Sequence, residues 1–374
     1  PTEFYLIHLP TPLAAKAQQT LSISYNVLSA LSPLPSSIGQ TEKQYLQYTF
    51  SAHTPSAYET ENQKTKLKFP NGDIPNYTLI PGSGTEDPQK QGSSITYGPY
   101  EKTPAGSTQP VTVRYEFTKP VLHTALLQRD IYVSHWGGAL SIEELYNPLT
   151  NAGAKLKGFF NRVEWQRSAY YNPASAALKE LRFPLTPGSS DAYVVDDIGN
   201  VSTTHWRSGA KEALLELRPR YPIFGDWRYK FKMGWSADLS QYLRNVGGDR
   251  FVLKVPFIEG PKASEGSVYE RVEVNVVLPE GATNVDFSTN IPILTNSTSF
   301  FRTYMDTTGR SKLTLVAQNV VDGQRESDLF VTYEYPWTAG LKKPLTIFGG
   351  MLSVFAAIWA LGQLNVNIGK AKSA

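Results

Sequence analysis

The chain has 374 residues, of which 41% are hydrophobic and 12% aromatic, a composition typical of folded globular proteins and not of disordered ones. The formal net charge is only +3 and the basic residues form no stripe, so we expect no nucleic-acid partner. The absence of cysteine excludes a disulfide framework, thiol chemistry and a cysteine-ligated metal site.

The first third of the chain predicts a β-rich domain over residues 1–118. Alternating apolar and polar residues indicate strands at 43–50, 65–69 and 111–117, and clusters of Gly and Pro separate them. The chain opens at Pro1 without a signal peptide. We therefore expect the natural start, and the opening strand of this domain, to lie upstream.

Residues 119–337 predict a second and larger β-rich domain. Its strand patterns run from 131–136 to 329–335, and the only helix expected among them is a short one at 174–181. The segment 196–200 predicts a hairpin turn in which Gly199 supplies the glycine.

Two segments of the first domain have counterparts in the second. Residues 68–76 and 277–284 each read as a strand that ends in Pro, followed by a polar residue and Gly, and residues 113–117 resemble 331–335. The order is the same in both halves, which favours a duplication. The predicted fold is therefore mainly β: two tandem, related, β-sandwich-like domains with few short helices, followed by one membrane helix.

A stretch near the end of the chain, 345–364, carries no charged residue. As an α-helix it would reach about 30 Å, the thickness of a hydrocarbon core, which predicts a transmembrane helix over 345–366 and a short cytosolic tail over 367–374. Gly349, Ser353 and Ala357 recur every fourth residue on one face, a spacing that lets another helix approach closely. We expect this face to pack against a partner helix.

The large segment before the helix is expected to lie in a lumen. Asn76, Asn200 and Asn296 each begin an Asn-x-Ser/Thr sequence, which would accept a glycan there.

Four tryptophans are candidates for a contact surface. Ser134-His135-Trp136 and Thr204-His205-Trp206 are similar tripeptides at strand ends, and residues 222–235 are rich in aromatic and basic side chains. Packing inside the core is the alternative for all of them. The candidate interface residues are Trp136, Trp206, Trp227 and Trp235.

The sequence nominates no catalytic residue. The five histidines form no H-E-x-x-H pair, and no G-x-S-x-G elbow, phosphate-binding loop or dinucleotide fingerprint occurs. A glycosidase would need two carboxylates at a set separation, which sequence cannot show. We expect no catalytic centre, no cofactor and no metal.

Several segments, in the same order, resemble the ribophorin I family, the large single-span subunit of the oligosaccharyltransferase complex. They are residues 41–44, 129–137, 158–167, 197–203, 217–225, 278–282 and 304–310. The resemblance implies a single-pass type I protein of the endoplasmic reticulum membrane. It implies a non-catalytic subunit that stabilises the complex and helps present the substrate, while a polytopic subunit transfers the glycan from dolichol pyrophosphate to Asn.

The resemblance also implies partners: the polytopic catalytic subunit, the other subunits of the complex, membrane lipid and nascent polypeptide. The tail after the helix is shorter than in animal members of the family, which suggests a fungal-type member and puts any ribosome contact in doubt. Two alternatives stay open from the residues alone, a single-span lumenal or surface glycoprotein that acts as a binding receptor, and a membrane-tethered glycosidase.

Overall fold

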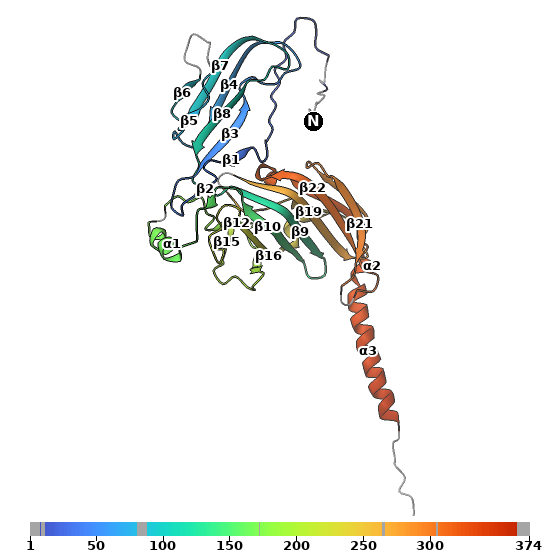
Figure 1. The fold of residues 1–374 in the computed structure, drawn as a ribbon. Helices are drawn as coiled ribbons and strands as arrows, with labels where there is room; N and C mark the ends of the chain where they lie inside the picture. Colours follow the sequence, from blue (N-terminus) through green and yellow to red (C-terminus); the bar gives the residue numbers. More distant parts are fainter. Residues whose placement is uncertain are drawn as a thin grey trace, which may run out of the picture.

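The computed structural model describes residues 8, 12–80, 88–171, 173–263, 266–303 and 306–364. It is mainly β, as predicted, and ends in one long apolar helix (Figure 1). The predicted tail, 367–374, lies outside the described residues.

The first unit is a sandwich of two antiparallel sheets. One sheet has the order β1-β3-β8-β5 and the other β4-β7-β6. Alternate residues of both sheets point into one core, among them Leu46, Ile95 and Val113. The strands are β1 (Leu31–Pro33), β3 (Tyr45–Ser51), β4 (Thr60–Lys68), β5 (Asn76–Tyr77), β6 (Gln89–Gln91), β7 (Ser94–Thr103) and β8 (Pro110–Glu116).

The second unit has a seven-stranded sheet, β13-β16-β10-β9-β19-β22-β21, and two smaller sheets that pack into the same core. The strands of the large sheet are β9 (Leu122–Ser134), β10 (Ala139–Asn151), β13 (Ser190–Asp196), β16 (Arg228–Asp238), β19 (Ser267–Glu280), β21 (Thr295–Phe301) and β22 (Arg310–Val321). The smaller sheets are β12 (Leu181–Leu185), β15 (Ala213–Leu217) and β14 (His205–Ser208), and β17 (Leu243–Gly247), β18 (Arg250–Pro256), β23 (Asp328–Glu334) and β20 (Thr283–Thr289).

The strand pairings repeat between the two units. The orders β1-β3-β8-β5 and β4-β7-β6 recur as β17-β18-β23-β20 and β19-β22-β21, with every corresponding pair antiparallel. The paired sequence segments occupy equivalent places, since each Pro-x-Gly segment follows β4 or β19 and each aromatic strand is β8 or β23. The predicted relation between the halves is thus confirmed in topology.

Among the strands that the structure describes, β9 to β16 have no counterpart in the first unit. They join the repeat through β9, which pairs with β19 in parallel, and then extend the sheet through β10, β16 and β13. Two local predictions in this insert were wrong, the second only in part. Residues 174–181 form no helix, and α1 (Arg162–Ala169) forms instead because the Asn161 side chain caps its first amides, those of Val163 and Glu164.

The second prediction, the hairpin at 196–200, was right for the turn and wrong for the strand expected after it. Asp196 Oδ1 accepts hydrogen bonds from the amides of Ile198 and Gly199, and Gly199 adopts φ 139°, so the tight turn is present. The chain beyond it makes only an isolated bridge back to β13, and β14 joins a different sheet.

Two buried amides connect the units. Gln44 donates from Nε2 to the carbonyls of Phe117 and Lys119, and its Oε1 accepts the amide of Ala154 at 2.7 Å. Asn151 accepts the amide of Val121, in the link between the units, at 3.1 Å. A short parallel pair, β2 (Ser37–Ile38) with β11 (Lys155–Leu156), adds backbone hydrogen bonds.

A buried ion cluster lies at the centre of the second unit. Arg129 of β9 has no exposed surface, and its guanidinium binds the carboxylates of Glu144 on β10 and Glu259 after β18, the latter at 2.8 Å. The guanidinium also lies 5.6 Å from the ring centroid of Trp235. One residue of the central strand therefore links three segments through charge.

The helix α3 (Lys342–Gln363) follows a single turn, α2 (Trp337–Gly340). No residue of α3 is buried, and the stretch from Trp337 to Gln363 is long and apolar enough to span a membrane. In Figure 1 the first sandwich and α3 lie at opposite ends of the second unit.

We expect Arg129→Met to lower the free energy of unfolding by roughly 3–5 kcal/mol, because it leaves two buried carboxylates without a cation. The measurement is the midpoint of urea unfolding of the full-length chain, with tryptophan fluorescence as the signal. Arg182→Met is the matched control, since Arg182 pairs with Glu180 while 62% of its side chain is exposed, and it should cost no more than about 1 kcal/mol. Equal shifts for the two variants would contradict the role of the cluster.

Candidate functional site

The join between the second unit and the membrane helix is built from contacts on several elements. Ala339 of α2 is buried against the turn after β19, where a Cβ on Gly281 would lie 2.8 Å from the Cβ of Ala339. Gly281 also adopts φ 94°, a conformation that favours glycine. Lys342 Nζ lies 3.3 Å from Thr308 Oγ1, and the amide of Tyr335 donates to the Asp249 carbonyl at 2.7 Å. The start of the helix is thus held against the domain.

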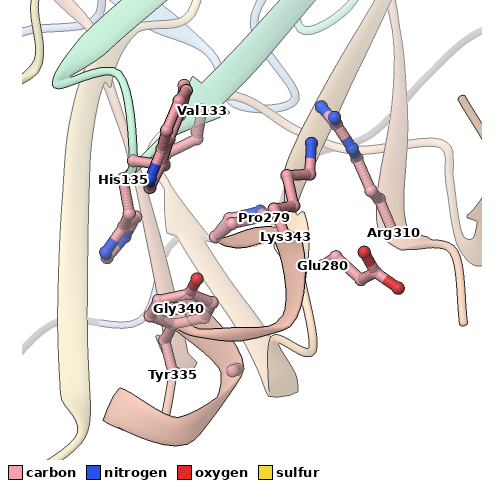
Figure 2. A pocket seen from close by; sticks show the side chains of 11 residues that line it. Val133, His135, Pro279, Glu280, Arg310, Tyr335, Gly340 and Lys343 are labelled. Carbon is pink, nitrogen blue, oxygen red and sulfur yellow. The ribbon is translucent and has the colours of Figure 1, made fainter. Parts of the chain in front are cut away.

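A cavity lies at this join, shown in Figure 2. Its walls come from the end of β9 and the turn after it, the ends of β19 and β23, the start of β22, the end of α2 and the start of α3. The lining residues include His135, Trp136, Glu280, Arg310, Tyr335 and Lys343.

The turn between β9 and β10 supplies His135 and Trp136. The His135 ring lies among Phe251, Tyr333 and Tyr335, with centroids 4.8, 5.8 and 4.5 Å away, and its Nε2 lies 2.7 Å from Tyr333 Oη. Burial lowers the pKa of His135, so the ring is neutral at pH 7. Packing of His135 into this aromatic box leaves the neighbouring Trp136 side chain in solvent.

One oxygen of the Glu280 carboxylate, Oε1, receives four hydrogen bonds. It accepts from the amide and the hydroxyl of both Thr307 and Thr308, at 2.7–2.9 Å. Burial acts to raise the pKa of Glu280, but these hydrogen bonds outweigh burial and lower the pKa to about 2. Glu280 is therefore an anion at neutral pH and fixes the 306–308 segment to the end of β19.

Asp306 joins the same segment to the membrane helix. It accepts from the Thr303 amide at 2.9 Å and from Arg310 Nε at 3.0 Å, and Lys343 Nζ lies 3.5 Å from its second oxygen. Burial acts to raise the pKa of Asp306, while its hydrogen bonds from Thr303 and Arg310 and the charge of Arg310 lower it overall. Both acidic groups at the join are thus bound to structural donors and hold α3 in place.

Sequence reasoning did not nominate Glu280 or Asp306, although both lie within segments that carry the family resemblance, 278–282 and 304–310. The cavity brings His135 and Trp136 of the Ser-His-Trp tripeptide together with Glu280, and Asp306 binds Arg310 and Lys343, two other residues of its lining. Among the residues the structure describes, no group of three or more His, Asp or Glu side chains has the geometry of a metal site.

The four candidate tryptophans do not form one surface. Trp136 is 72% exposed at the join, whereas Trp206 and Trp227 are partly buried against the core of the second unit. Trp235 is only 2% exposed and packs beside Arg129, so its place in a predicted interface is corrected to a place in the core.

The three sequons lie on separate elements and each Asn is exposed. Asn76 begins β5, Asn200 follows the turn after β13, and Asn296 lies on β21 at the edge of the large sheet. Along α3, Ser353 and Ala357 are exposed and Gly349 is partly exposed, and the Ser353 hydroxyl donates to the Gly349 carbonyl at 2.8 Å. Because its hydroxyl is already bonded within the helix, Ser353 offers a partner helix a small surface.

We expect Glu280→Gln to lower stability at pH 7 by roughly 1.5–3 kcal/mol, because hydrogen bonds to a charged acceptor are weakened. The folded-state pKa of about 2 lies below the ordinary value of 4.5, so the contribution of Glu280 is complete above pH 4.5 and is lost as the pH falls toward 2. The difference in urea midpoint between wild type and variant should therefore shrink across that window. Glu61→Gln, at an exposed position of β4, is the control, and a difference that is constant with pH would contradict the prediction.

The family model and the curated relatives of this chain indicate the same family. The family model described as Ribophorin I matches residues 1–362. Subunit 1 of dolichyl-diphosphooligosaccharide–protein glycosyltransferase from Schizosaccharomyces pombe is 32% identical over 95% of this chain and 79% of its own length. Subunit 1 from Caenorhabditis elegans is 33% identical over 97% of this chain and 60% of its own length, and subunit 1B from Arabidopsis thaliana is 32% identical over 98% and 76%.

Among solved structures, an M1 zinc metallopeptidase from Deinococcus radiodurans covers 56% of this chain and 42% of its own, with 13% identity and a TM-score of 0.35, which is too low to indicate a shared fold. The sequence matches, in contrast, extend over almost the whole chain. The chain belongs to the ribophorin I family.

Proposed function

We propose that this chain is a non-catalytic subunit of the oligosaccharyltransferase complex of the endoplasmic reticulum. It would support the transfer of a preassembled glycan from dolichol pyrophosphate to the Asn of N-x-S/T by stabilising the complex and helping to present the nascent polypeptide. The observation that carries the proposal is the match to relatives named as subunit 1 of that transferase over at least 95% of this chain.

The chemistry of the join supports a structural role. Glu280 and Asp306 are bound to threonine, arginine and lysine donors, and His135 is a neutral ring enclosed by aromatic side chains. A general acid needs a raised pKa near the working pH, and the pKa of Glu280 is shifted the opposite way. These groups hold the domain on its helix, which is what an accessory subunit requires.

The membrane helix supplies the proposed contact with the complex. No described residue of α3 is buried, and Gly349, Ser353 and Ala357 line one face with small side chains. We place a helix of the polytopic catalytic subunit, or of another subunit, against this face. Lipid would surround the remaining faces.

Substitutions on the small-residue face of α3 can distinguish a supporting role in the complex from a catalytic role. Gly349→Leu with Ser353→Leu should reduce the amount of complex recovered with the tagged chain in mild detergent, because bulky residues keep helices apart. Transfer to an N-x-T peptide should fall in proportion, so activity per mole of assembled complex stays constant. Leu352→Ala with Phe355→Ala, on other positions of α3, is the control. A fall in activity per assembled complex would contradict the non-catalytic role, and unchanged assembly would contradict the helix contact.

The orientation is tested by the sequons. We propose a single-pass type I topology with the domains in the lumen, so at least one of Asn76, Asn200 and Asn296 should carry a glycan removable by endoglycosidase. The exposure of all three side chains makes each accessible to modification. The readout is the mass of the corresponding peptides, with Asn→Gln variants as controls. A cytosolic location of these sites, shown by protease accessibility in sealed microsomes, would contradict the topology.

A further inference from the structure

We propose that the end of the second unit around the helix lies on the bilayer surface, with Trp136 in the interfacial layer of lipid headgroups. The inference rests on the proposed single crossing by α3. The surface, called here the membrane-facing rim, consists of Trp136, Val246, Phe300 and Trp337. Their side chains are 72%, 64%, 81% and 71% exposed.

The first step is that α3 is not joined to the second unit by a flexible linker. Ala339, Lys342 and Lys343 contact the Gly281 turn, Thr308 and Asp306, so the direction of the helix relative to the domain is set by packing and charge. The side of the domain that faces the membrane is set with it. In Figure 1, α2 and α3 lie directly beyond the ends of β21 and β22.

The second step is that three separate chain segments meet around the start of the helix. Trp136 lines the same cavity as Ala339, Gly340 and Lys343. Val246 lies near the end of β17, and the carbonyl of Asp249, in the turn that follows, accepts the Tyr335 amide just before α2. Phe300 precedes Phe301, which pairs with Arg310 in the wall of the cavity.

The third step concerns the side chains that these segments expose to solvent. Each presents a large apolar side chain to solvent, whereas the His135 ring beside Trp136 packs against Tyr335. Tryptophan is enriched at membrane–water interfaces, where the ring meets acyl chains and its N–H stays hydrated. Lys342, Lys343, Arg310 and Arg250 lie beside the rim and supply cations that can meet phosphate headgroups, although the carboxylates of Glu280, Asp306, Asp249 and Glu334 balance their charge.

The absence of cysteine allows a direct measurement of depth. Single-cysteine variants Trp136→Cys, Val246→Cys and Phe300→Cys of the full-length chain are labelled with a nitroxide and placed in nanodiscs of phosphatidylcholine with phosphatidylserine. Collision with oxygen, which concentrates in lipid, is compared with collision with a water-soluble nickel complex. Ile198→Cys and Tyr58→Cys, 79% and 80% exposed and away from the rim, are the matched controls. Met351→Cys, within α3, reports whether the helix is inserted.

We expect the ratio of oxygen to nickel collisions at positions 136 and 300 to exceed that at positions 198 and 58 by at least threefold. The ratio at position 246 should also exceed the control ratios. Ratios equal to the controls while position 351 is deep in lipid would overturn the rim and leave the proposed function intact. Labels shielded from both reagents would also overturn it, because a protein contact would then cover the surface. A water-exposed label at position 351 would overturn the single crossing and the rim together. Because three rim positions are labelled separately, the test still gives a result if one variant fails to fold.

Discussion

The second unit depends on the charge of one buried side chain. Arg129 lies on β9, the strand through which the inserted β9–β16 segment joins the repeat, and it binds carboxylates on β10 and after β18. Removing three charged groups from water costs several kcal/mol per ion, so the arrangement is stable only when all three are present in this geometry. Packings of the insert on the repeat that would separate these groups are therefore disfavoured, because they leave a buried charge unpaired.

Much of the architecture could be predicted from the sequence because it depends on local patterns. Alternation predicted most strands, an uncharged run predicted the apolar helix, and the Pro-x-Gly segments at 68–76 and 277–284 predicted that the two units are related. The helix expected at 174–181 failed because long-range packing decides that segment, in which Ala176, Ala177 and Leu178 are buried and Leu178 pairs with Ile223. α1 had a readable signal in Asn161, a side chain suited to a helix start.

The join to the membrane helix could be predicted only in part. His135 and Trp136 stood out as a motif, but nothing local shows that the ring of one enters an aromatic box and the other faces solvent. Glu280 and Asp306 are ordinary carboxylates in sequence, and their importance arises from donors on Thr303, Thr307 and Thr308 that the fold brings to them. Trp235 is the opposite case. Its position in a segment rich in basic residues suggested a surface side chain, but the core encloses it.

The duplication has a consequence for how the protein resists aggregation. In the second unit the outer edge of β19 is covered by β9, whereas its counterpart β4 is the last strand of its sheet. An open edge can recruit a strand from another chain. β4 exposes Lys64, Lys66 and Lys68 along its length, and repulsion between these charges discourages two copies from joining edge to edge. Equivalent edges in the two units are thus treated differently: one is paired within a larger sheet, and the other carries a row of lysines.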